Sequence, residues 1–193
     1  MNRIELGQKI SRDTLKARWA YAELTSSRFA NSYTGLVSDG LFARARGNVP
    51  FGELSENDRN ELIEALNRHK GRCGLVPALA PHESFICVAW TREQLLATIC
   101  VPGLQWIPLA DLVSMRGPFE RSHPRAAAKE IPSNQEIQQI EPIIVLPDFI
   151  DLEHRGPLLL EGTFRSVMFL RCKDPSARIM VWIPMAASGV SEP

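Results

Sequence analysis

Residues 158–166 read Leu158-Leu159-Leu160-Glu161-Gly162-Thr163-Phe164-Arg165-Ser166, and this stretch decides the predicted fold. An apolar run stops at an acidic residue and a glycine, and an arginine follows three positions after the glycine. We predict a strand, a tight turn and a helix, because Phe164, Val167 and Met168 follow the three-and-four spacing of one helical face. The alternative is a β-hairpin with its turn at Glu161-Gly162, and the spacing favours the helix because the residues after the turn do not alternate strictly.

The predicted turn has the features of an anion-binding site. The start of a helix presents amide donors and the positive end of the helix dipole, and a glycine allows a ligand to come close. The candidate ligand-binding residues are Gly162, Thr163, Arg165 and Ser166. Arg165 would supply paired donors that suit a phosphate. The candidate catalytic residues are Glu161 and Arg165, since a carboxylate can bind Mg²⁺ or take a proton.

The composition is that of a folded protein with no overall charge. The chain has 193 residues, of which 45% are hydrophobic, so it is one large domain or one domain with a substantial extension. Lysine plus arginine equals aspartate plus glutamate, 22 against 22. This balance removes the general basic surface of proteins that grip nucleic acid through phosphates, although a local basic patch remains open.

The cysteines predict free thiols in a reducing compartment. None of the four belongs to a Cys-x-x-Cys pair, and three lie in or beside apolar segments, so we expect neither a structural metal nor disulfides. The first 30 residues carry charges throughout, which argues against a secretory signal. No apolar run approaches the roughly 20 residues that span a bilayer. We therefore expect a cytoplasmic protein that does not associate with membranes.

The first part of the chain predicts a long helix followed by a loop. Residues 12–30 place Leu15 and Trp19 on one face, with basic residues on the other. Residues 31–55 are rich in glycine, asparagine and serine, which is typical of turns. Arg44, Arg46 and Tyr33 could contact a ligand from this loop, but a mobile, solvated connection is the simpler interpretation.

Two helix-capping patterns flank a predicted strand. Ser55 with Asp58 three residues later predicts one helix start, and Thr91 with Gln94 predicts another. Between these helices, residues 85–90 form an apolar run without alternation, which predicts a strand buried on both faces.

The second half of the chain alternates short strands and helices. A proline-broken, mildly basic segment at residues 116–133 predicts a loop from which His123 and Arg125 could reach a ligand. The expected elements are a strand with a following helix at 106–115, a short helix ending near 140, a strand at 143–146, a polar connection at 148–156, the strand and helix around Gly162, and a last strand at 178–183.

Over about residues 104–184 this order resembles the ParB N-terminal and sulfiredoxin-like superfamily. Its members place a Pro-Ile-hydrophobic strand before a strand that runs into Asp-Gly-x-x-Arg and a helix. The matching stretches are Trp106-Ile107-Pro108-Leu109-Ala110-Asp111-Leu112, Glu141-Pro142-Ile143-Ile144-Val145, the 158–165 signature and residues 178–183. The resemblance covers roughly 80 residues, and its signature is short.

The resemblance implies that the signature cradles the phosphates of a nucleotide, with Mg²⁺ as a further cofactor. Gly162 and Arg165 carry over directly, Glu161 only in charge and Thr163 only by position. Phe164 departs from the polar residues that active members often have, which argues against phosphoryl transfer. Alternative functions are a non-catalytic regulatory or interaction protein on the same scaffold and a nuclease-like DNA-processing protein.

The predicted fold class is α+β. We expect a mainly helical region at residues 1–83 and a ParB/sulfiredoxin-like domain with a small mixed sheet at residues 84–193. The expected partners are a nucleotide or another phosphate ligand and a protein partner, while binding to nucleic acid and catalysis both remain open.

Overall fold

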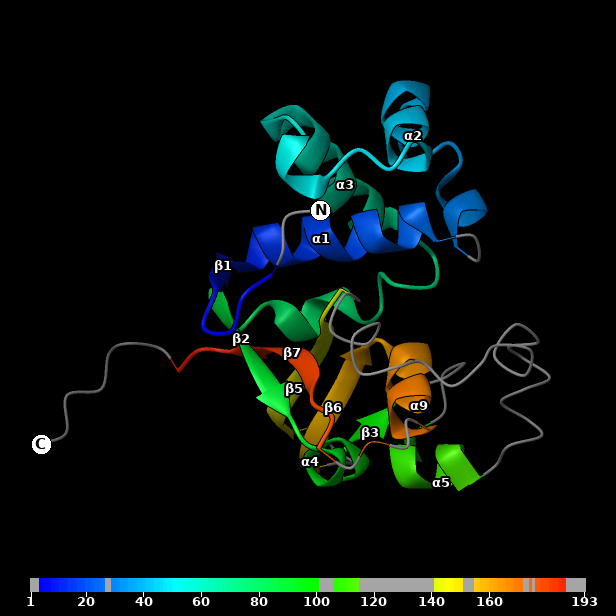
Figure 1. Ribbon diagram of the computed structural model, residues 1–193. Helices are drawn as coiled ribbons and strands as arrows, with labels where there is room; N and C mark the ends of the chain where they lie inside the picture. Colours follow the sequence, from blue (N-terminus) through cyan, green and yellow to red (C-terminus); the bar gives the residue numbers. More distant parts are fainter. Residues whose placement is uncertain are drawn as a thin grey trace, which may run out of the picture. The chain divides into compact units, whose positions relative to one another are not determined.

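A computed structural model of the chain describes residues 4–26, 29–100, 106–114, 141–150, 155–171, 174 and 176–186 (Figure 1). The chain divides into two compact units. Unit 1 contains Met1–Ile4, Lys9–Phe85 and Met185–Pro193, and unit 2 contains Glu5–Gln8 and Ile86–Pro184. The domain boundary that the sequence predicts between residues 83 and 84 stays a prediction.

The prediction of an α+β fold is confirmed. Seven strands form one mixed sheet in the order β1-β2-β7-β5-β6-β3-β4. The strands are β1 (Lys9–Ser11), β2 (Ser84–Trp90), β3 (Ile99–Cys100), β4 (Ile107–Pro108), β5 (Ile143–Ile150), β6 (Arg155–Glu161) and β7 (Ile179–Pro184). Strand β2 runs through both units, since Ser84 and Phe85 belong to unit 1 and the remainder belongs to unit 2.

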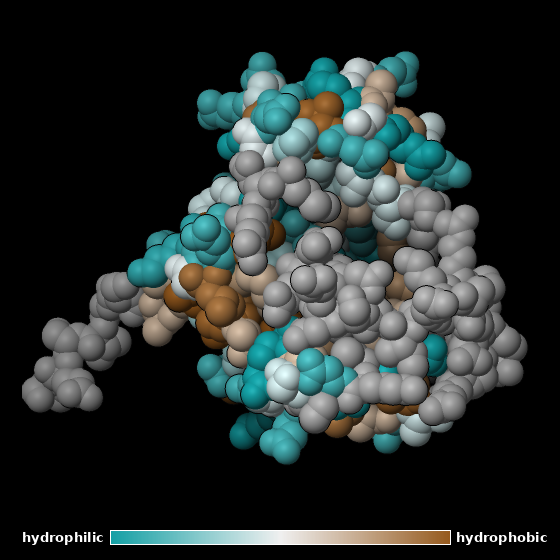
Figure 2. Space-filling view, viewed as in Figure 1, coloured by the Kyte–Doolittle hydropathy of each residue, from teal (hydrophilic) through white to brown (hydrophobic). Residues whose placement is uncertain are grey.

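Unit 1 is mainly helical. Its α-helices are α1 (Arg12–Thr25), α2 (Asp39–Arg46) and α3 (Glu56–Arg68), and its 3₁₀ turns are Ala30–Tyr33, Phe51–Glu53 and Val76–Leu79. Most side chains on the visible face of α2 and α3 are hydrophilic, with some hydrophobic ones among them (Figure 2). The helix predicted at residues 12–30 is too long, because α1 ends at Thr25. The Thr25 hydroxyl donates to the carbonyl oxygens of Tyr21 and Ala22, a local bond that competes with further helix.

Helix α2 lies where the sequence predicted only a loop. Ser38 caps it, since its Oγ accepts from the Leu41 amide at 3.3 Å. Asp39, in the middle of the predicted loop, lies in the first helical turn, where its charge suits the dipole. The prediction of a solvated loop is therefore wrong for this segment, because burial of Leu41 and Ala45 favours a helix despite the turn-forming residues.

Both predicted capping boxes are confirmed. At the start of α3, the Ser55 Oγ accepts from the Asp58 amide at 3.1 Å, and the Asp58 carboxylate accepts from the Ser55 amide at 3.1 Å. Thr91 and Gln94 make the same reciprocal bonds at the start of α4 (Arg92–Leu96). These local hydrogen bonds depend only on neighbouring residues, which explains why the sequence predicts them.

Unit 2 packs α4, α5 (Leu109–Ser114) and α9 (Thr163–Arg171) with the sheet (Figure 1). Strand β6 pairs with β5 in the antiparallel sense and with β3 in the parallel sense. One hydrophobic core joins these elements, and its strand residues include Cys100, Ile143, Val145, Leu159 and Val181. The strand that carries the signature is therefore in the interior of the sheet.

The lengths and burial of some strands differ from the predictions. Residues 148–150 and 155–156 belong to strands instead of a polar connection, because Phe149 pairs with Gly156 and Ile150 pairs with Arg155. Strand β2 is not fully buried on both faces: Phe85 and Cys87 are buried on one face, but Ile86 and Val88 on the other face are only half-buried. Residues 116–133 and the helix predicted up to residue 140 lie outside the described residues.

Within the described ranges, no helix has the length and apolar character needed to cross a bilayer.

Candidate functional site

A single glycine, Gly162, joins strand β6 to helix α9. Strand β6 ends at Glu161 and α9 begins at Thr163, so the predicted helix is confirmed over the hairpin. Gly162 has a φ of +102°, in the region that side-chain-bearing residues rarely adopt. The Ser166 amide donates to the Gly162 carbonyl oxygen at 2.8 Å, which closes the first turn of α9.

The Gly162 turn packs tightly against strand β5. A Cβ atom at this position would lie 2.3 Å from Cγ2 and 2.7 Å from Cβ of Ile143. Ile143 is completely buried, so it has little room to move away. Glycine is required here both for its backbone conformation and for the close approach of two chain segments.

Arg165 folds back over the turn. Its Nη2 lies 3.3 Å from the position that a Cβ of Gly162 would occupy, and the same group donates to Oε2 of Glu161. The two side chains form an ion pair across the Gly162 turn, and only 16% of the Arg165 side chain and 17% of the Glu161 side chain is exposed. The predicted arginine is therefore at the start of α9, where it is paired with the acidic residue that ends β6.

The two hydroxyl residues of the predicted site differ in burial. Thr163 begins the helix and is half-buried, which leaves it accessible at the turn. Ser166 is completely buried, and its Oγ has no hydrogen-bond partner among the residues that the structure describes. A buried hydroxyl without a partner costs about 1–3 kcal/mol. Ser166 lies on the inner side of α9 together with Phe169 and Leu170, which are three and four residues further along.

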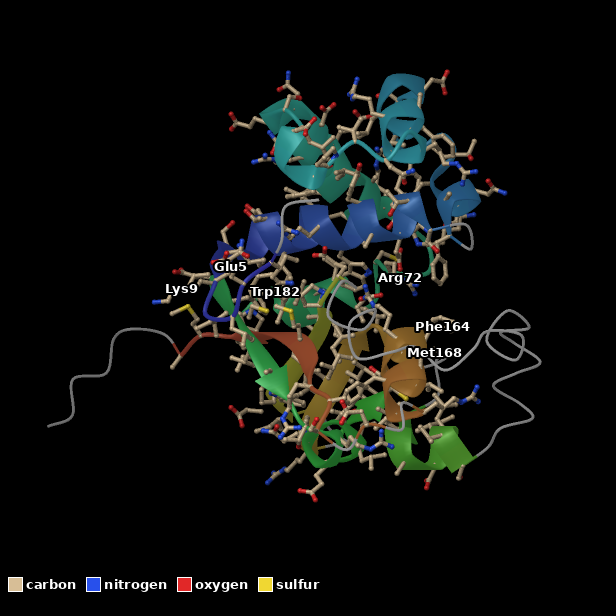
Figure 3. All side chains as sticks on the ribbon, viewed as in Figure 1. Glu5, Lys9, Arg72, Phe164, Met168 and Trp182 are labelled. Carbon is tan, nitrogen blue, oxygen red and sulfur yellow. The ribbon has the colours of Figure 1, made fainter. Side chains whose placement is uncertain are left out.

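Phe164 lies beside the site and packs against the core. It is half-buried and contacts the hydrophobic cluster that contains Val167 and Met168 of the same helix. Phe164 and Met168 both project from α9 (Figure 3). Phe164 therefore helps to anchor the helix on the core.

The C-terminal half of α9 is held by specific contacts. Four consecutive buried residues, 167–170, fix the helix on the core. Arg92 at the start of α4 donates from Nη1 to the carbonyl oxygen of Phe169 at 3.3 Å and from Nη2 to that of Leu170. Cationic donors at the end of a helix satisfy carbonyl groups that the helix leaves without partners. The contacts with the core and with α4 therefore fix the position of α9 and of the Gly162 turn that precedes it.

The arrangement can attract an anion but does not form a metal site among the described residues. Amide groups in the first turn of a helix lack intrahelical acceptors, and the dipole adds positive potential there. The Glu161 carboxylate is already paired with the Arg165 guanidinium at this position. No group of three or more histidine, cysteine, aspartate or glutamate side chains that could hold a metal occurs in the described part of the chain.

Two residues named as ligand candidates, His123 and Arg125, cannot be placed beside this site, because both lie outside the described residues. The structure brings together Glu161, Gly162 and Arg165.

Unit 1 contains a buried polar cluster that the sequence did not reveal. The Glu23 carboxylate is 2% exposed and accepts from Trp19 Nε1 at 3.3 Å, from Arg72 Nε at 2.6 Å and from the Tyr33 hydroxyl at 2.8 Å. Tyr33, which we had placed in a solvated loop, is completely buried. Burial and the neighbouring Glu23 raise the pKa of the Tyr33 hydroxyl. The available signal was the glutamate four residues after Trp19, on the apolar face of a predicted helix.

The cluster has the character of a structural link. Its carboxylate has three donors and is closed off from solvent, so it has no open position for a ligand. The site at Gly162 therefore remains the candidate functional site. No family of known proteins, no curated protein and no solved structure matches this chain, so its function has to be argued from the geometry of that site.

Proposed function

We propose that this protein binds a phosphate-bearing ligand, of which a nucleotide is the leading candidate, at the turn between β6 and α9. The observation that carries the proposal is the position of the Arg165 guanidinium over Gly162 at the start of a nine-residue helix. The backbone amides of the first turn, the dipole and a guanidinium then converge on one anion. Thr163 and Arg165 would contact the phosphate, and the buried Gly162 would shape the turn that presents them.

The ParB/sulfiredoxin-like architecture is part of the same proposal. Strand, glycine turn and helix follow in the order of the family signature, and Arg165 occupies its arginine position. Arg165 pairs with Glu161, the residue that takes the place of the family's acidic residue.

The geometry favours binding over phosphoryl transfer. Arg165 engages Oε2 of the Glu161 carboxylate, and this ion pair makes Glu161 a poorer base and a poorer ligand for Mg²⁺. Phe164 packs against the core where a polar group would serve the reaction. A non-catalytic regulatory role on this scaffold is therefore the second candidate function, while the charge balance of 22 against 22 argues against a nuclease.

Thermal unfolding with and without nucleotides and Mg²⁺ tests the proposal. A nucleotide that binds the folded state should raise the midpoint temperature of thermal unfolding of the protein, and Arg165→Ala should abolish that rise. Arg155→Ala is the matched control, because Arg155 is exposed at the far end of the same strand. A wild-type protein that no nucleotide or inorganic phosphate stabilises would refute ligand binding at this turn.

A phosphate-release assay separates the two candidate functions. If the protein only binds, incubation with nucleotide and Mg²⁺ should release no phosphate above the level of the Arg165→Ala variant. Turnover that depends on Arg165 would instead make the protein an enzyme.

A further inference from the structure

His69 closes the C-terminal end of α3 and is buried, with 8% of its surface exposed. Its Nδ1 accepts from the Gly71 amide at 3.2 Å, and its Nε2 lies 2.8 Å from the Ser32 Oγ. The Ser32 hydroxyl donates to the Phe29 carbonyl oxygen at 2.6 Å, so its oxygen must accept from the imidazole. These contacts together require the neutral imidazole with its proton on Nε2.

The same turn connects His69 to the buried polar cluster. The His69 carbonyl oxygen accepts from the amides of Arg72 and Cys73, both at 2.9 Å. This turn places Arg72, whose Nε donates to Glu23 of α1. The imidazole ring also lies on the Tyr33 ring, with 4.8 Å between centroids, and the Tyr33 hydroxyl donates to Glu23. His69 is therefore linked to the Glu23 carboxylate in two ways, through Arg72 and through Tyr33, and protonation of the imidazole would affect both links.

We propose that His69 is an acid-sensitive latch that holds the turn at residues 69–73 and the 3₁₀ turn Ala30–Tyr33 in place. A second proton would go to Nδ1, which faces the Gly71 N–H group. The bond to Gly71 would be lost, and two donors would point at each other in a buried site. The turn that carries Arg72 would then loosen, while the rest of the helical unit keeps its own core.

The surrounding charges determine the direction of the pH effect. Burial lowers the pKa of His69, Arg72 lowers it further, and Glu23 acts in the opposite direction. The net pKa lies below the ordinary value of 6.5, so the unfolded chain binds the proton more readily than the folded one. The stability that neutral His69 contributes is therefore present above pH 6.5 and falls as the pH drops from 6.5 through the folded-state pKa.

Hydrogen exchange of the full-length protein at about pH 7.5 and about pH 5 tests the latch. After correction for intrinsic exchange, the Gly71 amide of the wild type should lose protection severalfold at the lower pH. His69→Gln should remove this pH dependence, because the glutamine amide can accept from Gly71 and donate to Ser32 but does not titrate. His82→Gln is the matched control: burial also lowers the pKa of His82, but its ring lies against Phe85, outside the latch.

The result that would overturn the latch is equal loss of Gly71 protection in wild type and His69→Gln. The tautomer gives a second test that needs no His69 variant. In the ¹⁵N-histidine spectrum of the wild type near neutral pH, His69 should carry its proton on Nε2 and should titrate below 6.5. A proton on Nδ1, or titration above 6.5, would contradict the proposal even if the variant failed to fold.

Discussion

The Arg165 guanidinium donates to the Glu161 carboxylate across one turn, and the glycine between them has no side chain to separate them. The Glu161 carboxylate is therefore bonded to the same guanidinium that a phosphate ligand would use. A ligand that binds at this turn has to compete with a negative charge that belongs to the protein itself. This relationship leads to the first prediction.

Glu161→Gln should bind a phosphate-bearing nucleotide more tightly than the wild type. Removal of the competing charge should lower Kd about fivefold, since an ion pair such as Arg165–Glu161 is worth about 1 kcal/mol. Isothermal titration with the nucleotide that stabilises the wild type gives the measurement. Equal or weaker binding by Glu161→Gln, with intact binding by the wild type, would mean that Glu161 positions the guanidinium for the ligand.

Gly162→Ala should destabilise the protein by about 3 kcal/mol, because a methyl group would overlap with Ile143 in an unfavourable backbone conformation. Urea unfolding measures the loss. Gly156→Ala is the control within the same strand: Gly156 also has a positive φ, but a Cβ there meets nothing within 4 Å. If the two variants lose the same stability, the close approach to Ile143 contributes nothing.

Ser166→Ala should stabilise the protein by about 1 kcal/mol, because it removes a buried hydroxyl without a partner and adds a better helix former. Nucleotide affinity should stay unchanged if Ser166 lies on the inner side of the helix, as its complete burial indicates. Chemical denaturation and calorimetric titration of the same variant provide both values. A loss of affinity would return Ser166 to the ligand-binding residues.

Glu23→Ala should cost about 3–5 kcal/mol, since it leaves the buried donors of Trp19, Tyr33 and Arg72 without their shared acceptor. Glu64→Ala, on the exposed face of α3, should change the unfolding free energy by less than about 0.5 kcal/mol. The comparison uses urea unfolding at one pH. A small effect of Glu23→Ala would show that the cluster adds little to stability.

Thiol reagents should modify Cys73 quickly and should reach Cys87 and Cys100 only after unfolding. Cys73 is exposed, whereas the other two are buried, and burial raises the pKa of the Cys100 thiol to about 11. Less thiolate means slower reaction. Peptide mapping after brief alkylation identifies the modified residue, and Cys73→Ser is the control. Rapid labelling of Cys100 in the folded protein would contradict this prediction.

The sequence by itself determined the elements whose causes are local. Ser55 with Asp58, and Thr91 with Gln94, define helix starts through bonds between neighbours, and these predictions are confirmed. The strand, glycine turn and helix around Gly162 were also predicted correctly, because the hydrophobic spacing changes at the glycine.

Only the tertiary structure decided the features that depend on distant partners. Burial made a helix of a segment rich in turn formers, α2, and strand pairing extended β5 and β6 into a polar region. The side-chain links also needed folding: Glu23 meets Arg72, 49 residues away, and Arg92 meets Leu170, 78 residues away. Local patterns record backbone preference, whereas such contacts arise when the chain closes long loops to bury its apolar surface.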